Sequence, residues 1–170
     1  DHWLRGMDGT GDGLSEWMSA PHTGMDNQHE RAGYWGDRVS KGVDLNCYLV
    51  RECEAFARLA ELSGRREVSA EYRNLAGVRR EAIRTRMWDE GDGFFYDLNA
   101  KVLKLTGGKH DAPLPEYGWN QGPFCDMALK IPGCWMNSRW SRTGDCMKRF
   151  RDGQPPFIRV KTVAGFAPLW

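Results

Sequence analysis

The sequence predicts an all-α protein, and two observations lead to this prediction. Apolar residues recur at helical spacing in two long stretches, 44–64 and 67–88, with charged residues on the opposite side of each. Only a short polar link separates the two stretches, which is typical of an antiparallel helical hairpin. Because one hairpin leaves its apolar stripes uncovered, we expect further helices to pack against it.

The first helix is expected to begin at Asp44, a common N-cap residue, and to end before Gly64, a common C-cap residue. Its predicted buried stripe consists of Leu45, Leu49, Cys53, Phe56 and Ala60. The second helix is expected to span residues 67–88, with Trp88 in the core at the end of the hairpin. Its predicted water-facing side consists of Arg79, Arg80, Glu81, Arg84 and Arg86.

After the second helix the pattern changes. Glycines interrupt the chain at 91 and 93, and residues 94–97 read as a short extended piece. Residues 106–155 contain many glycines and prolines without sustained periodicity, which is unusual for so long a stretch inside a compact domain. We interpret 106–155 either as an irregular insertion or as a mis-called segment of a gene model, and its composition favours the second. Residues 1–170 otherwise read as part of one domain.

Composition excludes several classes of partner and site. The net charge of +1 gives no basic surplus for nucleic acid, and no apolar stretch reaches the roughly 18 residues that a membrane helix needs. The five cysteines follow neither a disulfide nor a zinc pattern, which is typical of free thiols in a reducing compartment such as the cytoplasm.

Asp8, Thr10 and Asp12 resemble the start of a calcium loop. An EF-hand also needs a carboxylate at the twelfth position of the loop, where this sequence has Ser19. We therefore expect no metal site, and we expect the Asp-Gly repeats to form turns.

Asp26 is the candidate catalytic residue. It lies between Met25 and Asn27 in a turn-rich segment bounded by Trp17 and Trp35, and such surroundings favour a raised carboxyl pKa. A carboxylic acid with a raised pKa suits general-acid catalysis, although Asp in such a loop also serves commonly as a turn cap. The amide of Asn27 and the rings of the two tryptophans suit sugar hydroxyl groups and sugar faces.

Four motifs follow one another along the chain: Gly-Met-Asp-Asn within residues 22–28, Val-Asp-Leu-Asn at 43–46, Phe-Phe-Tyr-Asp at 94–97 and Phe-Ala-Pro-Leu-Trp at 166–170. In this order they resemble the six-hairpin glycosidases, the clan that includes the trehalases and glycoside hydrolase family 63. The resemblance covers about residues 1–100 and 157–170. It implies a fragment of an (α/α)₆ toroid, which is built from antiparallel helical hairpins.

The resemblance also implies an activity, namely inverting hydrolysis of α-linked glucosyl or mannosyl groups of small saccharides, without a cofactor. It assigns the general acid to Asp26, and the residues expected to border the sugar are Trp17, Asn27, Gln28, Trp35 and Asp44. Asp44 is equally suited to a plain helix cap. In this clan the catalytic base follows the Pro-Leu-Trp motif, so we expect residues 1–170 alone to be inactive. Two alternatives stay open, a non-catalytic carbohydrate-binding remnant and a helical scaffold protein.

Overall fold

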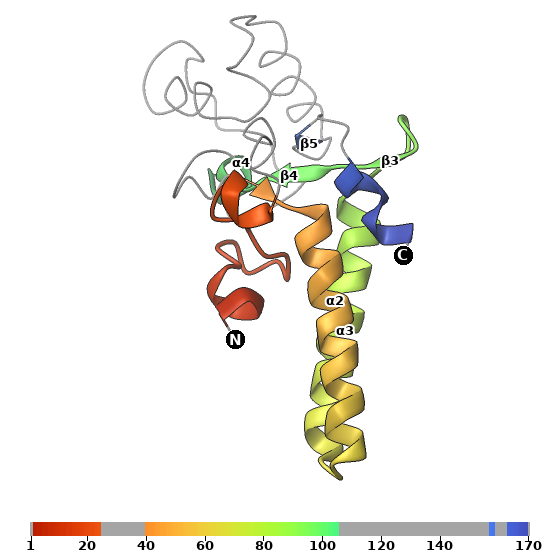
Figure 1. The fold of residues 1–170 in the computed structure, drawn as a ribbon. Helices are drawn as coiled ribbons and strands as arrows, with labels where there is room; N and C mark the ends of the chain where they lie inside the picture. The colour runs from red at the N-terminus through yellow and green to blue at the C-terminus, as the bar shows by residue number, and fades with distance from the viewer. Residues whose placement is uncertain (1, 25–39, 106–156, 159–162, 170) are drawn as a thin grey trace, which may run out of the picture.

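The computed structural model describes residues 2–24, 40–105, 157–158 and 163–169. They form a long helical hairpin, one end of which is covered by short segments from elsewhere in the chain (Figure 1). The element order is η1 (His2–Gly6), η2 (Ala20–Thr23), β1 (Ser40–Lys41), α2 (Val43–Leu62), α3 (Arg66–Arg86), β2 (Trp88–Asp89), β3 (Phe94–Phe95), β4 (Asp97–Asn99), α4 (Ala100–Leu105), β5 (Phe157–Ile158) and η3 (Val163–Leu169).

Helices α2 and α3 confirm the predicted hairpin, and their bounds differ from the prediction by only one or two residues. Gly64 lies in the link with φ of 74°, a left-handed conformation that glycine adopts without steric cost. At the start of α2 the prediction was wrong, because Gly42 occupies the N-cap position and Asp44 lies in the first turn.

Two small antiparallel sheets correct the prediction of an all-α fold. One sheet has the strand order β1-β4-β5, with Ser40 opposite Asn99, and the other pairs β2 with β3, with Trp88 opposite Phe95. The predicted extended piece at 94–97 is confirmed. The other strands were missed because strands of two or three residues are too short to display an alternating pattern. Most of the described residues are nevertheless helical.

The main core lies where the hairpin meets β4 and β5. It consists of Leu14, Val43, Val50, Cys53, Ala76, Ala82, Ile83, Met87, Tyr96, Leu98, Leu103 and Phe157. Trp88 is not part of it, contrary to the prediction, because its ring packs on Phe95 in the β2–β3 hairpin and its indole N–H donates to Glu90.

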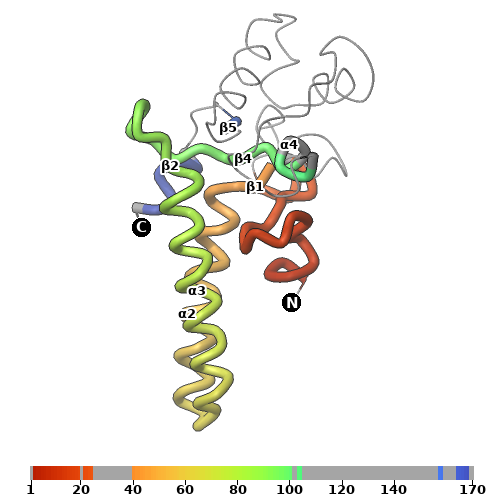
Figure 2. The backbone as a smooth tube through the Cα atoms, turned by 180° about the vertical axis from the view of Figure 1, so that it is seen from behind, coloured from red at the N-terminus to blue at the C-terminus, as the bar shows by residue number. Residues whose placement is uncertain are grey.

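The opposite end of the hairpin extends away from the rest of the described chain (Figure 2). Phe56, Leu59 and Leu62 are exposed there, although Phe56 was predicted to be buried. This matches the expectation that one hairpin leaves apolar surface uncovered. A toroid needs six hairpins and the described residues hold one, so the toroid stays a prediction. Residues 106–155 lie outside the described part of the chain.

Candidate functional site

Two residues predicted to border the sugar, Trp17 and Asp44, meet at the N-terminal end of α2. The indole Nε1 of Trp17 donates a hydrogen bond to Asp44 Oδ1 over 2.9 Å, and the Leu45 N–H donates to the same oxygen over 2.7 Å. Both side chains are buried, with exposed fractions of 6% and 1%. Gly42 permits this approach, since a Cβ there would lie 2.4 Å from Trp17 Nε1.

Asp97 supplies the side-chain cap of α2 that Asp44 was expected to supply. Its Oδ1 accepts a hydrogen bond from the Val43 N–H over 2.8 Å, and its Oδ2 accepts one from Ser40 Oγ over 3.0 Å. A carboxylate at this position is also stabilised by the positive end of the helix dipole. Residue spacing could not predict this role of Asp97, because it cannot reveal a partner so far along the chain.

Arg79 joins the hairpin to the N-terminal segment inside the protein, which corrects the prediction that it faces water. Its guanidinium donates to Ser15 Oγ over 2.9 Å, to Asn46 Oδ1 over 2.5 Å and to Leu4 O over 3.3 Å. Asn46 Oδ1 also accepts from the Ser15 N–H, and Asn46 Nδ2 donates to Ser15 O. Burial lowers the pKa of Arg79 from its ordinary value, yet a guanidinium of this kind stays charged.

Four predicted site residues lie outside the part of the chain that the structure describes: Asp26, Asn27, Gln28 and Trp35. Their roles stay predictions, but the attachment of their segment is described. Before it, Oγ of Ser19, the N-cap residue of η2, lies 2.8 Å from Nδ1 of His22 within η2. After it, Ser40 accepts the Trp17 N–H through its carbonyl over 2.8 Å. Ser40, the first described residue after the segment, thus bonds to Trp17 through its carbonyl and to Asp97 through its hydroxyl, and it completes a buried polar cluster with Trp17, Asp44 and Asp97.

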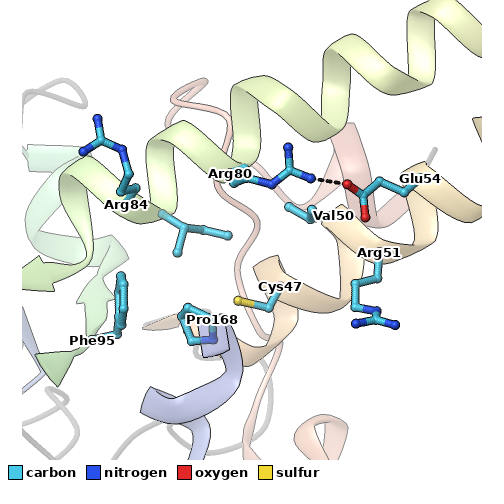
Figure 3. Close-up of a pocket in the computed structure, with 9 residues that line it drawn as sticks. Cys47, Val50, Arg51, Glu54, Arg80, Arg84, Phe95 and Pro168 are labelled. Atoms are coloured by element: carbon cyan, nitrogen blue, oxygen red, sulfur yellow. Dashed lines mark hydrogen bonds and ion pairs between the residues drawn. The ribbon is translucent and has the colours of Figure 1, made fainter. Parts of the chain in front are cut away.

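A pocket of about 310 Å³ lies between α2, α3 and η3 (Figure 3). It is lined by Cys47, Val50, Arg51, Glu54, Arg80, Ile83, Arg84, Phe95 and Pro168. Arg80 forms an ion pair with Glu54 at its edge. Burial, together with the carboxylates of Asp44 and Asp97, raises the pKa of Cys47 to about 12. The thiol therefore stays protonated at neutral pH and is a poor nucleophile.

Two further findings apply to the described ranges alone. Within them, no three His, Cys, Asp or Glu side chains come together in a way that would hold a metal ion. The helices found there are too short or too polar to cross a membrane. Cys47 and Cys53 are free thiols, as predicted, whereas the other three cysteines lie outside the described residues.

The sequence as a whole matches the model of one protein family. Residues 1–170 match the mannosylglycerate hydrolase MGH1-like glycoside hydrolase domain. The chain belongs to this family. The prediction of a glycoside hydrolase is thereby confirmed at the level of the family, and a carbohydrate substrate follows from it. The buried cluster of Trp17, Ser40, Asp44 and Asp97 is thus a feature of an MGH1-like domain, and Ser40 follows in sequence the segment that carries Asp26.

Proposed function

We propose that this MGH1-like domain is part of an inverting glycoside hydrolase that acts on α-linked glucosyl or mannosyl groups of small saccharides. The observation that carries the proposal is the family match over residues 1–170, a range that includes the Gly-Met-Asp-Asn motif at 24–27. The family takes its name from a mannosylglycerate hydrolase, and a mannosyl group falls within the proposed substrate class.

Asp26 is proposed as the general acid. In an inverting reaction, it would donate its proton to the leaving glycosidic oxygen while a second carboxylate activates a water on the opposite face of the sugar. The two carboxyl groups of such a pair lie roughly 6.5–9.5 Å apart, which leaves room for the water. Asp26 must therefore be protonated before the reaction, as a raised pKa would allow.

The proposed sugar contacts are Asn27, Gln28, Trp35, Trp17 and Asp44. The first three belong to the same segment as Asp26, so they would reach the substrate together with the acid. Trp17 and Asp44 are buried and bonded to each other, so their contact with a sugar would require the groups that cover them to move aside.

The test uses the protein expressed from its complete coding sequence and compares Asp26→Asn with Asp92→Asn. Asp92 is exposed in the turn between β2 and β3, so its substitution removes the same charge without touching the N-terminal segment. Proton NMR follows the anomeric signals during hydrolysis of α-glucosides and α-mannosides. We expect the β-anomer to appear first, and we expect turnover to fall by about a hundredfold or more in Asp26→Asn alone.

Other results would contradict the proposed function or favour one of its alternatives. An α-anomer as first product would contradict inversion, and equal activity of the two variants would remove Asp26 from the mechanism. Saccharide binding without turnover, measured by calorimetry, would favour a carbohydrate-binding remnant. Absence of both binding and turnover would favour a helical scaffold.

A further inference from the structure

The loop at residues 8–14 is built around the side-chain ammonium group of Lys41. Lys41 is fully buried, and its Nζ lies 3.2 Å from Asp8 Oδ1, 2.9 Å from Asp12 Oδ1 and 2.5 Å from Leu14 O. An ammonium group has three N–H donors, and these three oxygens use all of them. The three acceptors occupy the first, fifth and seventh positions of the pattern that resembles a calcium loop.

The backbone of this loop is held in place by the same carboxylates, which confirms the prediction of turns. Asp8 Oδ1 accepts from the Asp12 N–H over 3.2 Å, and Asp8 Oδ2 accepts from the Gly13 N–H over 2.7 Å. Gly11 and Gly13 have φ of 68° and 84°, which glycine adopts without strain. The loop oxygens therefore converge on the ammonium position through bonds within the loop itself.

Among the residues that the structure describes, the charged side chains around the loop balance without a metal ion. Three carboxylates meet three cationic side chains: Asp8, Asp12, Glu16, Lys41, Lys104 and Arg86. Lys104 Nζ lies 2.8 Å from Glu16 Oε2, and Arg86 Nη1 lies 3.8 Å from Asp12 Oδ2. A divalent cation would have to displace a buried ammonium group and would add an excess positive charge to this set.

We propose that the loop 8–14 is a cation-binding loop whose cation is the chain's own Lys41 ammonium group, so that the wild-type protein takes up no divalent metal ion there. Thr10, at the third position of the pattern, supplies a further oxygen that a metal ion could use once the Lys41 side chain is removed. Its Oγ1 is buried and has no hydrogen-bond partner among the described residues. An ammonium group has no fourth donor to offer it, whereas Ca²⁺ takes six to eight oxygen ligands and would use it.

Removal of the Lys41 side chain should therefore open the loop to Ca²⁺. The experiment measures the melting temperature in Ca²⁺ and in EDTA for the wild type, for Lys41→Ala and for Asp8→Asn/Asp12→Asn/Lys41→Ala. We expect the wild type to melt at the same temperature in both. Lys41→Ala should melt lower in EDTA and rise by roughly 5 °C or more in saturating Ca²⁺. The triple variant, which lacks the carboxylates, should not respond.

Two results would overturn the proposal. One is a Ca²⁺-dependent rise in the melting temperature of the wild type that Asp8→Asn abolishes, because a metal would then share or replace the ammonium position. The other is a folded Lys41→Ala protein that does not respond to Ca²⁺. If Lys41→Ala does not fold in either condition, the melting temperatures of the wild type in Ca²⁺ and in EDTA decide. Calorimetric titration of the wild type with Ca²⁺ tests independently whether it binds the ion. None of these measurements requires glycosidase activity.

Discussion

Arg79→Met is expected to lower the free energy of unfolding by about 3 kcal/mol. Met keeps most of the apolar stem but removes the buried hydrogen bonds to Ser15, Asn46 and the Leu4 carbonyl. Hydrogen bonds from a charged donor contribute roughly 1.5–3 kcal/mol each, so the three would sum to roughly 4.5–9 kcal/mol. Burial of the guanidinium costs several kcal/mol and offsets part of this sum, which leaves the stated difference.

The assay is urea unfolding followed by tryptophan fluorescence, with the free energy obtained from the midpoint and slope. Arg80→Met is the matched control, because Arg80 follows Arg79 on α3 but is exposed and paired with Glu54 at the surface. We expect the control to change the free energy of unfolding by no more than about 0.5 kcal/mol. A loss of no more than about 0.5 kcal/mol in Arg79→Met would contradict a stabilising role of these buried hydrogen bonds, because Arg79 would then behave as a surface residue.

Cys47 in the folded protein is expected to react with iodoacetamide at about pH 8 roughly a thousandfold more slowly than in urea, because a pKa of about 12 in place of 9.0 lowers the thiolate fraction by that factor. Peptide mass spectrometry measures this, and equal rates would contradict the raised pKa. Gly77→Ala is expected to raise the free energy of unfolding by about 0.5–1 kcal/mol, since a Cβ at this position within α3 meets nothing within 4 Å. Gly165→Ala is expected to lower the free energy of unfolding, because a Cβ at this position would lie 2.3 Å from the Phe94 ring. The same urea titration should give opposite signs for the two glycine variants.

Helical spacing located α2 and α3 from the sequence, but the charge of Arg79 placed it wrongly on the water-facing side. Arg79 lies one turn from both Ala76 and Ala82, so the periodicity itself puts it on the apolar stripe, and only its charge suggested water. Its partners, Ser15 and Asn46, come from distant parts of the chain. No local pattern reveals that such polar groups will meet inside a core.

At the candidate site, too, the sequence indicated the residues but not the contacts between them. Motif order led to the family and to the Asp26 segment, and Trp17 and Asp44 were both among the predicted contacts. Their mutual hydrogen bond could not be predicted, because it depends on the close approach at Gly42. The Asp-Gly pattern likewise showed which loop residues carry side-chain oxygens. It did not show which cation binds them, and nothing in the sequence indicated Lys41.

The N-terminal segment is held in place by partners that come much later in the chain. Leu4 binds Arg79, Asp8 binds Lys41, and Glu16 binds Lys104. Because synthesis runs from the N-terminus to the C-terminus, the carboxylates and carbonyls of residues 4–16 stay in water until these partners are made, and Lys104 in α4 is the last of the three. Contacts between residues so far apart in the sequence close long loops, which costs chain entropy. The contacts between α2 and α3 join neighbouring parts of the sequence and cost less. Residues 4–16 are thus made well before the side chains that they bind.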